Sequence, residues 1–220
     1  LSVKIILMTT QLQSLLNSPE DTRDQQWEIN FFEQFVKEKV DLVFPDPKPG
    51  PDSWPYLFLH TGPNAKEPVK DVLGWLSEKG VGLALNPNKE MPDYIMPYGM
   101  IWYYRETGNF LSDHFKFTGK KLQIEQGKQY FTGEPSKAYI PEYVRKVVRE
   151  FLRQQGVLNP RVCMLSEDQQ YWDLCFSLES LGNPPSHEHA GIAEALGWFF
   201  PNHYSIVLIS ESAIGSFYSL

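Results

Sequence analysis

The C-terminal half of the chain alternates strand-like and helix-like segments in an order that few folds share. Four short runs rich in β-formers lie at 129–132, 161–165, 171–178 and 203–209. A helical pattern separates the first run from the second, and another separates the third from the fourth. The order strand, helix, strand, strand, helix, strand is typical of the split βαβ, or ferredoxin-like, sandwich. We therefore predict an α+β protein whose C-terminal domain, residues 129–212, has this fold.

The helices of this domain have clear limits in the sequence. The first opens at Ile140-Pro141-Glu142 and ends at Gly156, and the second is capped by Ser186 and stopped by Pro201. The predicted core face of the first helix consists of Val144, Val147, Val148, Phe151 and Leu152. We expect the apolar tail, 213–220, to pack back on the body or to edge a sheet.

The N-terminal half also mixes helices and strands. Helices are predicted at 10–16, from 19 onward and at 67–79, and strands at 40–44, 56–60 and 81–85. Five prolines between Pro45 and Pro55 predict an irregular loop there. We assign an N-terminal α+β domain to residues 8–113, followed by a polar linker at 114–128.

The aromatic segment at 92–110 is the most ambiguous part of this domain. It concentrates β-forming side chains between Tyr94 and Tyr104, and Pro97 and Gly99 interrupt a helical reading. We predict a strand or a bulged pair of strands that turns at 106–109.

Composition excludes several classes of protein. The chain has 220 residues and a formal net charge of −7, with 12 basic and 16 acidic residues up to Lys120 and 8 and 11 after it. Because neither half is basic, nucleic-acid binding is not predicted. No apolar run approaches the ~20 residues that span a bilayer, so we predict no membrane association. Met8 resembles a natural start, and the first seven residues have no cleavage site of the kind signal peptides carry, which favours a cytoplasmic protein.

Short motifs in both halves resemble the SseB (enhanced serine sensitivity) family. The strand at 81–87, VGLALNP, follows a helix and is similar to the strand ending in Asn-Pro in that family's N-terminal domain. The motifs at 133–135, 140–143 and 160–165 are similar to the opening of its C-terminal domain. The resemblance covers residues 40–210, and segments 98–104 and 174–180 depart from it. It implies a bacterial, soluble, two-domain protein without an established catalytic site, and it offers no functional residues to carry over.

No catalytic or cofactor motif is present in the sequence. A Gly-rich phosphate loop, Gly-x-Ser-x-Gly and His-Glu-x-x-His are absent. His187 and His189 are two residues apart at a helix start, so they diverge and more simply form a polar first turn than a metal site. Asp113-His114 lies in a polar segment with no nucleophile beside it. We predict no enzyme activity, no cofactor and no metal.

The two cysteines leave a second reading open. Cys163 and Cys175 lie on the two arms of one predicted hairpin, joined through 167–169, so they are expected to be neighbours. Two cysteines do not indicate a disulfide framework, and free buried thiols are the simpler interpretation. A redox pair is the alternative, although Cys-x-x-Cys and flanking basic residues are missing.

Arginine and aromatic side chains are the candidates for binding a protein partner. Arg145, Arg149 and Arg153 are spaced to form one stripe on a helix, which either pairs with Glu142 and Glu150 or anchors an acidic partner. The aromatic candidates are Trp54 in the proline-rich loop and Tyr98 and Trp102 in the ambiguous segment, where core packing is the competing interpretation.

These patterns favour binding over chemistry. We expect a non-enzymatic module that binds another protein, whose identity the sequence does not indicate. The alternative is an enzyme or small-molecule sensor with a pocket between the domains, and an acidic protein that neutralises a basic partner is a third reading. A pocket holding two or more histidines beside a carboxylate would favour the enzyme or sensor. A groove lined by Trp54, Trp102 and tyrosines would favour protein binding.

Overall fold

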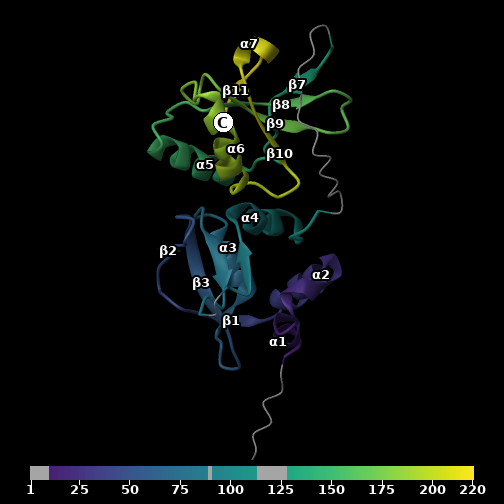
Figure 1. The fold of residues 1–220 in the computed structure, drawn as a ribbon, viewed down its shortest axis with the longest axis vertical. Helices are drawn as coiled ribbons and strands as arrows, with labels where there is room; N and C mark the ends of the chain where they lie inside the picture. Colours follow the sequence, from purple (N-terminus) through teal and green to yellow (C-terminus); the bar gives the residue numbers. More distant parts are fainter. Residues whose placement is uncertain (1–9, 89–90, 113–127) are drawn as a thin grey trace, which may run out of the picture. The chain divides into compact units, whose positions relative to one another are not determined.

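The computed structural model describes residues 10–88, 91–112 and 128–220, and these form a mixed α+β protein with two β-sheets (Figure 1). One compact unit contains the chain up to Leu76 together with Val81–Met96, and the other contains Ser77–Gly80 and Pro97–Leu220. Residues 1–7, the pair Asp113-His114 and nearly all of the predicted linker at 114–128 lie outside the described residues.

The N-terminal unit is built on a sheet with the strand order β4-β1-β3-β5-β6, and β2 also pairs with β3. The strands are β1 (Lys39–Leu42), β2 (Lys48–Pro49), β3 (Pro55–Thr61), β4 (Glu67–Pro68), β5 (Gly82–Leu85) and β6 (Tyr94–Met96). β3 and β5 run parallel and are joined through the helix α3 (Val69–Leu76), whereas the other pairs are antiparallel. The helices expected at 10–16, from 19 onward and at 67–79 and the strands expected at 40–44, 56–60 and 81–85 are therefore present, and three short strands, β2, β4 and β6, join them.

Two N-terminal helices, α1 (Gln11–Leu16) and α2 (Gln25–Phe35), complete this unit, with a short 3₁₀ turn, η1 (Glu20–Thr22), between them. The side chain of Asp24 caps α2 by accepting a hydrogen bond from the Trp27 amide at 2.8 Å. The rings of Trp27, Phe31 and Phe32 pack against Tyr94 of β6, which fixes α2 over one face of the sheet. Each such buried aromatic side chain contributes about 1.5–3 kcal/mol to stability.

The C-terminal unit contains a sheet with the order β10-β9-β8-β11. Its strands are β7 (Phe131–Gly133), β8 (Arg161–Ser166), β9 (Asp173–Ser177), β10 (Ser205–Ile209) and β11 (Tyr218–Ser219). β8 pairs antiparallel with β9 on one edge, and its other edge is shared by β7 and β11, which pair with different halves of it. β9 and β10 are parallel neighbours joined through η2 (Ser186–Glu188) and α6 (His189–Gly197).

This pairing differs from that of the split βαβ sandwich. The element order β7, α5 (Glu142–Gln154), β8, β9, α6, β10 is the expected one. In a split βαβ unit, however, β7 and β8 would be parallel and separated by another strand, whereas here they are direct antiparallel neighbours. Element order does not specify which edges pair, and the ferredoxin-like topology predicted from it is not the one observed.

The ambiguous aromatic segment is a helix, not a pair of strands. α4 (Tyr98–Thr107) follows Pro97 and ends at Gly108, whose φ of 75° is the left-handed conformation that glycine favours at a helix end. Only Tyr94–Met96 is extended. α4 belongs to the C-terminal unit, although the sequence division placed it before residue 113. Tertiary packing of its aromatic residues overrides their β-propensity.

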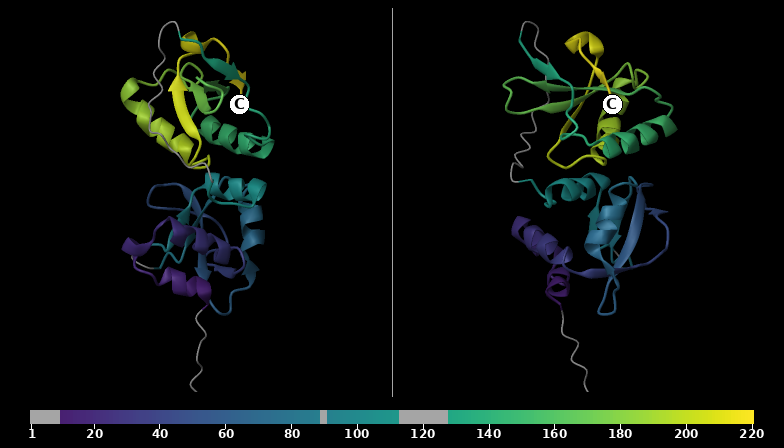
Figure 2. Two further views of the ribbon diagram at one scale, coloured as in Figure 1. Left: turned by 90° about the vertical axis from the view of Figure 1, so that its right-hand side faces the viewer. Right: turned by 180° about the vertical axis from the view of Figure 1, so that it is seen from behind.

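The C-terminal tail edges the sheet, as expected. After α7 (Glu211–Ile214), the chain returns so that Tyr218 and Ser219 pair with Val162 and Arg161 of β8. Figures 1 and 2 place α7 at the opposite end of this unit from α5 and α6. The tail therefore completes an otherwise open edge of the central strand.

Gly99 allows α4 to approach the backbone of the 198–200 segment. A Cβ at this position would lie 2.0 Å from the carbonyl oxygen of Phe200. We expect Gly99→Ala to lower the free energy of unfolding by about 1–3 kcal/mol, because neither backbone can yield without cost. Gly191 of α6 has open space around it, and Gly191→Ala should raise stability by up to about 1 kcal/mol. Urea unfolding of both variants tests this, and equal effects would contradict it.

Candidate functional site

A row of aromatic side chains lies on one face of the N-terminal sheet. Tyr56 and Phe58 alternate along β3, and Trp54 directly precedes the strand, so continuing the strand period of two places the three on the same face. Register pairing aligns Phe58 with Ala84 of β5 and Ala84 with Ile95 of β6. The ring of Phe44 meets that of Phe58 edge-on, with centroids 6.1 Å apart. We call Phe44, Trp54, Tyr56, Phe58 and Ile95 the aromatic face.

Two glycines make room for the ring of Tyr56 in this surface. A Cβ at Gly50 would lie 2.8 Å from the ring of Tyr56, and one at Gly82 would lie 2.7 Å from it. The Tyr56 ring therefore lies over both backbones, and its hydroxyl donates a 2.6 Å hydrogen bond to Asp52. Phe44 and Ile95 remain 44% and 45% exposed at the margins, and Trp54 and Phe58 are partly exposed. The result is a partly exposed aromatic surface in which the hydroxyl of Tyr56 is bonded to Asp52.

Trp54 was predicted from the sequence as a candidate for binding, whereas its neighbours in this surface were not. The alternation of aromatic residues at positions 54, 56 and 58 was the available signal. Ile95 reaches this face through the pairing of β5 with β6, and Phe44 reaches it through the turn after β1. Local sequence specifies neither arrangement.

Tyr98 and Trp102 are core residues, so the expectation that they present a binding surface is not supported. Both side chains are at most 1% exposed. The Tyr98 hydroxyl donates to the Ser77 carbonyl at 2.7 Å, and the Trp102 indole donates to the Phe199 carbonyl at 2.8 Å. Burial raises the pKa of Tyr98 far above its ordinary value. Both rings hold α4 on the 198–200 segment.

The three arginines of α5 have different surroundings. Arg145 is buried and donates to the carbonyls of Ile140 and Pro135. Arg149 donates to the Leu220 carbonyl and pairs with Glu142 at 2.8 Å. Arg153 pairs with Glu150 on the exposed surface at 2.7 Å. The predicted pairing with Glu142 and Glu150 is confirmed, and the continuous exposed stripe is not, because Arg145 is buried.

Among the described residues, each of the two units contains a hollow, and neither hollow is lined by two histidines. One, of about 430 Å³, is lined mainly by polar and charged side chains around Arg145 and Arg149. The other, of about 400 Å³, lies at the carboxyl ends of the parallel strands β3 and β5 and includes His60, Asn86 and Asp93. Asn86, at a φ of 51°, donates to both Asp93 and Thr61, so its amide is already engaged.

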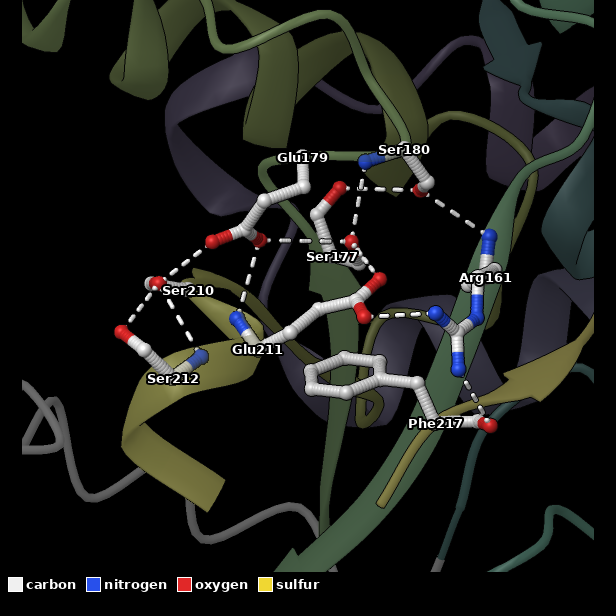
Figure 3. Close-up of polar contacts among 8 residues, drawn as sticks. All are labelled: Arg161, Ser177, Glu179, Ser180, Ser210, Glu211, Ser212 and Phe217. Carbon is white, nitrogen blue, oxygen red and sulfur yellow. Dashed lines mark hydrogen bonds and ion pairs between the residues drawn. The ribbon is translucent and has the colours of Figure 1, made fainter. Parts of the chain in front are cut away.

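A polar network lies at the carboxyl ends of the second parallel pair, β9 and β10 (Figure 3). The buried hydroxyl of Ser177 donates to Glu211 at 2.7 Å, and the other oxygen of Glu211 accepts from Arg161 at 2.5 Å. Glu179 accepts from the Ser210 hydroxyl and from the backbone amide of Glu211. We call these five residues the latch, because they connect the start of α7 to β8 and β9.

The latch is poorly suited to catalysis. Ser177 is completely buried, so a substrate carbonyl has no path to its hydroxyl. Hydrogen bonds from Ser210 and from the Glu211 amide lower the pKa of Glu179, which keeps it ionised and unsuited to donate a proton at neutral pH. The hydrogen bonds from Ser177 and Arg161 to Glu211, and from the Glu211 amide to Glu179, instead hold the start of α7 against β8 and β9.

The two cysteines are direct cross-strand partners. Cys163 of β8 is in register with Cys175 of β9, and both are free and fully buried. The expectation that they are neighbours is confirmed. They lie in an apolar cluster with Leu165, Ile209 and Phe217.

The histidine turn at the start of α6 does not converge. The His187 imidazole points to solvent, 3.7 Å from Glu188, whereas the Nε2 of His189 lies 2.9 Å from the Pro184 carbonyl. In the parts of the chain that the structure describes, no three His, Cys, Asp or Glu side chains gather as metal ligands would. Within the same parts, no helix combines the length and the apolar character needed to cross a bilayer.

Comparison with known proteins yields no relative. No protein-family model, no curated protein and no solved structure matches this chain. The functional argument therefore depends on the surfaces and networks described above.

Arg145 should matter for stability, whereas Arg153 should not. Arg145→Ala leaves buried carbonyls without their charged donor and should lower the free energy of unfolding by about 2–4 kcal/mol. Arg153→Ala removes an exposed ion pair and should change it by less than about 0.5 kcal/mol. Chemical denaturation of the two variants measures the contrast. A small effect at Arg145 would mean that its contacts are dispensable.

The latch should weaken on acidification. The pKa of Glu179 is lower in the folded chain than its ordinary value of 4.5, so its contribution to stability is full above pH 4.5 and is lost as the pH falls through the folded value. In Glu179→Gln this contribution is absent at every pH. The stability difference between the native chain and the variant should therefore shrink between pH 6 and pH 3 in urea titrations. A difference independent of pH would exclude ionised Glu179 from the latch.

Proposed function

We propose that this protein is a non-enzymatic module that binds another protein through the aromatic face of its N-terminal sheet. The observation that carries the proposal is the cluster of Phe44, Phe58 and Ile95. These side chains keep apolar area exposed around the ring of Tyr56, which lies over the backbones of two glycines. Aromatic side chains on rigid strands lose little entropy on binding and are common energetic centres of interfaces.

The chemistry of the surface suggests the class of partner. Neither of the two hollows is lined by the aromatic face, and an exposed aromatic surface suits an apolar segment of a protein better than a small polar molecule, which needs an enclosing pocket. Two acidic residues belong to the segment between β1 and β3: Asp46 is exposed and follows Phe44 by two residues, and Asp52 accepts a hydrogen bond from the Tyr56 hydroxyl. With a net charge of −7, the chain favours a partner whose apolar segment is flanked by lysine or arginine.

A cytoplasmic, SseB-like, two-domain protein is the setting we propose for this activity. The short motifs around 81–87 and 140–143 support the resemblance, and the division into two compact units is compatible with it.

A small-molecule sensor is the second candidate. Its support is the hollow around Asn86, since ligands of sheets with parallel strands bind outside the carboxyl ends of those strands. It ranks lower because the polar side chains of that hollow already bond one another, including Asn88 with His60 at 3.0 Å.

Capture of partners from the native lysate tests the proposal. The double variant Phe44→Ser/Ile95→Ser changes only exposed side chains and should lose a stoichiometric partner that the unaltered chain retains, with affinity reduced at least tenfold. Trp54→Ala should weaken the binding of the same partner.

Leu158→Ser is the matched control, because Leu158 is 74% exposed in the C-terminal unit and should leave capture unchanged. If no partner is retained by the unaltered chain, or if the control and the double variant behave alike, the aromatic face is not the binding surface.

A further inference from the structure

The cross-strand cysteines have the geometry of a dithiol that can close. Opposite residues of an antiparallel pair have Cα atoms about 4.5–5.5 Å apart and project their side chains to the same face. Disulfides span Cα separations of roughly 4.4–6.8 Å. Cys163 and Cys175 occupy such a position in β8 and β9, so a bond between their sulfur atoms requires little movement of the sheet.

Part of the cover over this pair comes from the segment that follows β10, and Tyr130 and Val207 also pack against the cluster. Phe217 belongs to the buried cluster around the two sulfur atoms, and Ile214 of α7 packs against that cluster. Both follow the latch residue Glu211 in sequence. The segment 210–219 is thus a strap across the cysteine-bearing face of the sheet, with β11 pairing to β8 at its far end.

The start of the strap is held by polar contacts near the surface, whereas its far end is held by the buried ring of Phe217 and the pairing of β11 with β8. Arg161 contacts it twice, through Glu211 and through the Phe217 carbonyl at 3.1 Å (Figure 3). The side chains of Arg161 and Glu211 are 44% and 26% exposed. Water competes for such bonds, and a short element held by them opens locally at less cost than the whole unit unfolds.

We propose that Cys163 and Cys175 form a reversible disulfide with each other by exchange with a low-molecular-weight disulfide such as oxidised glutathione. We also propose that the strap controls the access of this oxidant to the two thiols. The Cys163 thiolate attacks one sulfur of the oxidised glutathione and expels one glutathione thiolate, which takes up a proton. Cys175 then loses its proton and attacks the Cys163 sulfur, which releases the second glutathione. Two electrons pass from the dithiol to the reagent, and each glutathione leaves as a thiol.

The contact between the two sulfur atoms suits this order of events. A hydrogen bond from Cys175 lowers the pKa of Cys163, while the same bond and burial raise the pKa of Cys175. The thiolate is the attacking species in thiol–disulfide exchange, so Cys163 is the first nucleophile and Cys175 the resolving one.

The test follows disulfide formation in the reduced full chain with excess oxidised glutathione, using alkylation and intact-mass measurement. The unaltered chain should convert slowly to a form that has lost two hydrogens and no longer alkylates. Glu211→Gln should convert about tenfold faster, the factor expected for loss of one charge-assisted hydrogen bond. Cys175→Ser should stop with one glutathione attached to Cys163.

Glu150→Gln is the matched control, since it breaks an exposed ion pair of the same unit away from the strap and should leave the rate unchanged. Ser210→Ala, a milder change in the latch, should give an intermediate rate and serves if Glu211→Gln does not fold. Equal rates for the latch variants and the control would overturn the role of the strap. Thiols that stay reduced until the chain unfolds in urea would overturn the disulfide itself.

Discussion

The need to pair both edges of β8 organises the C-terminal unit. Its inner edge is taken by β9, but its outer edge is completed by two short strands, β7 and β11, that lie far apart in the sequence. A buried strand cannot leave its amides and carbonyls unpaired without a large cost in free energy. The return of the C-terminal tail therefore follows from hydrogen bonding, and the strap, the latch and the burial of Cys163 and Cys175 depend on that return.

A second constraint, close approach to glycine, recurs in both units. In the N-terminal unit, Gly50 and Gly82 make room for the ring of Tyr56, which belongs to the aromatic face, where Phe44 and Ile95 remain exposed. In the C-terminal unit, Gly99 lets α4 meet the backbone of residue 200. The same lack of a Cβ thus produces an open surface in one place and a closed core in the other.

Local sequence predicted elements well and their partners poorly. The helix with Val144 and Val148 on its buried face and the strand around Leu83 were predictable, because periodicity and burial act within a few residues. The helix at Tyr98–Thr107 was not, because its aromatic residues favour strands until they pack on the 198–200 segment. Arg145 looked like a member of an exposed stripe, and only the carbonyls of residues 135 and 140 explain its burial.

The sequence by itself determined the α+β class, the order of elements from β7 to β10, the pairing of Arg149 and Arg153 with acids and the proximity of the two cysteines. These features depend on spacings within one element or one hairpin. The tertiary structure decided that β7 pairs directly with β8, that Tyr98 and Trp102 are core, and that Phe44 and Ile95 join Trp54 on one face. The same local pattern is compatible with many strand pairings and registers. Which strand edges and helix faces become partners is therefore decided by contacts between residues far apart in the sequence.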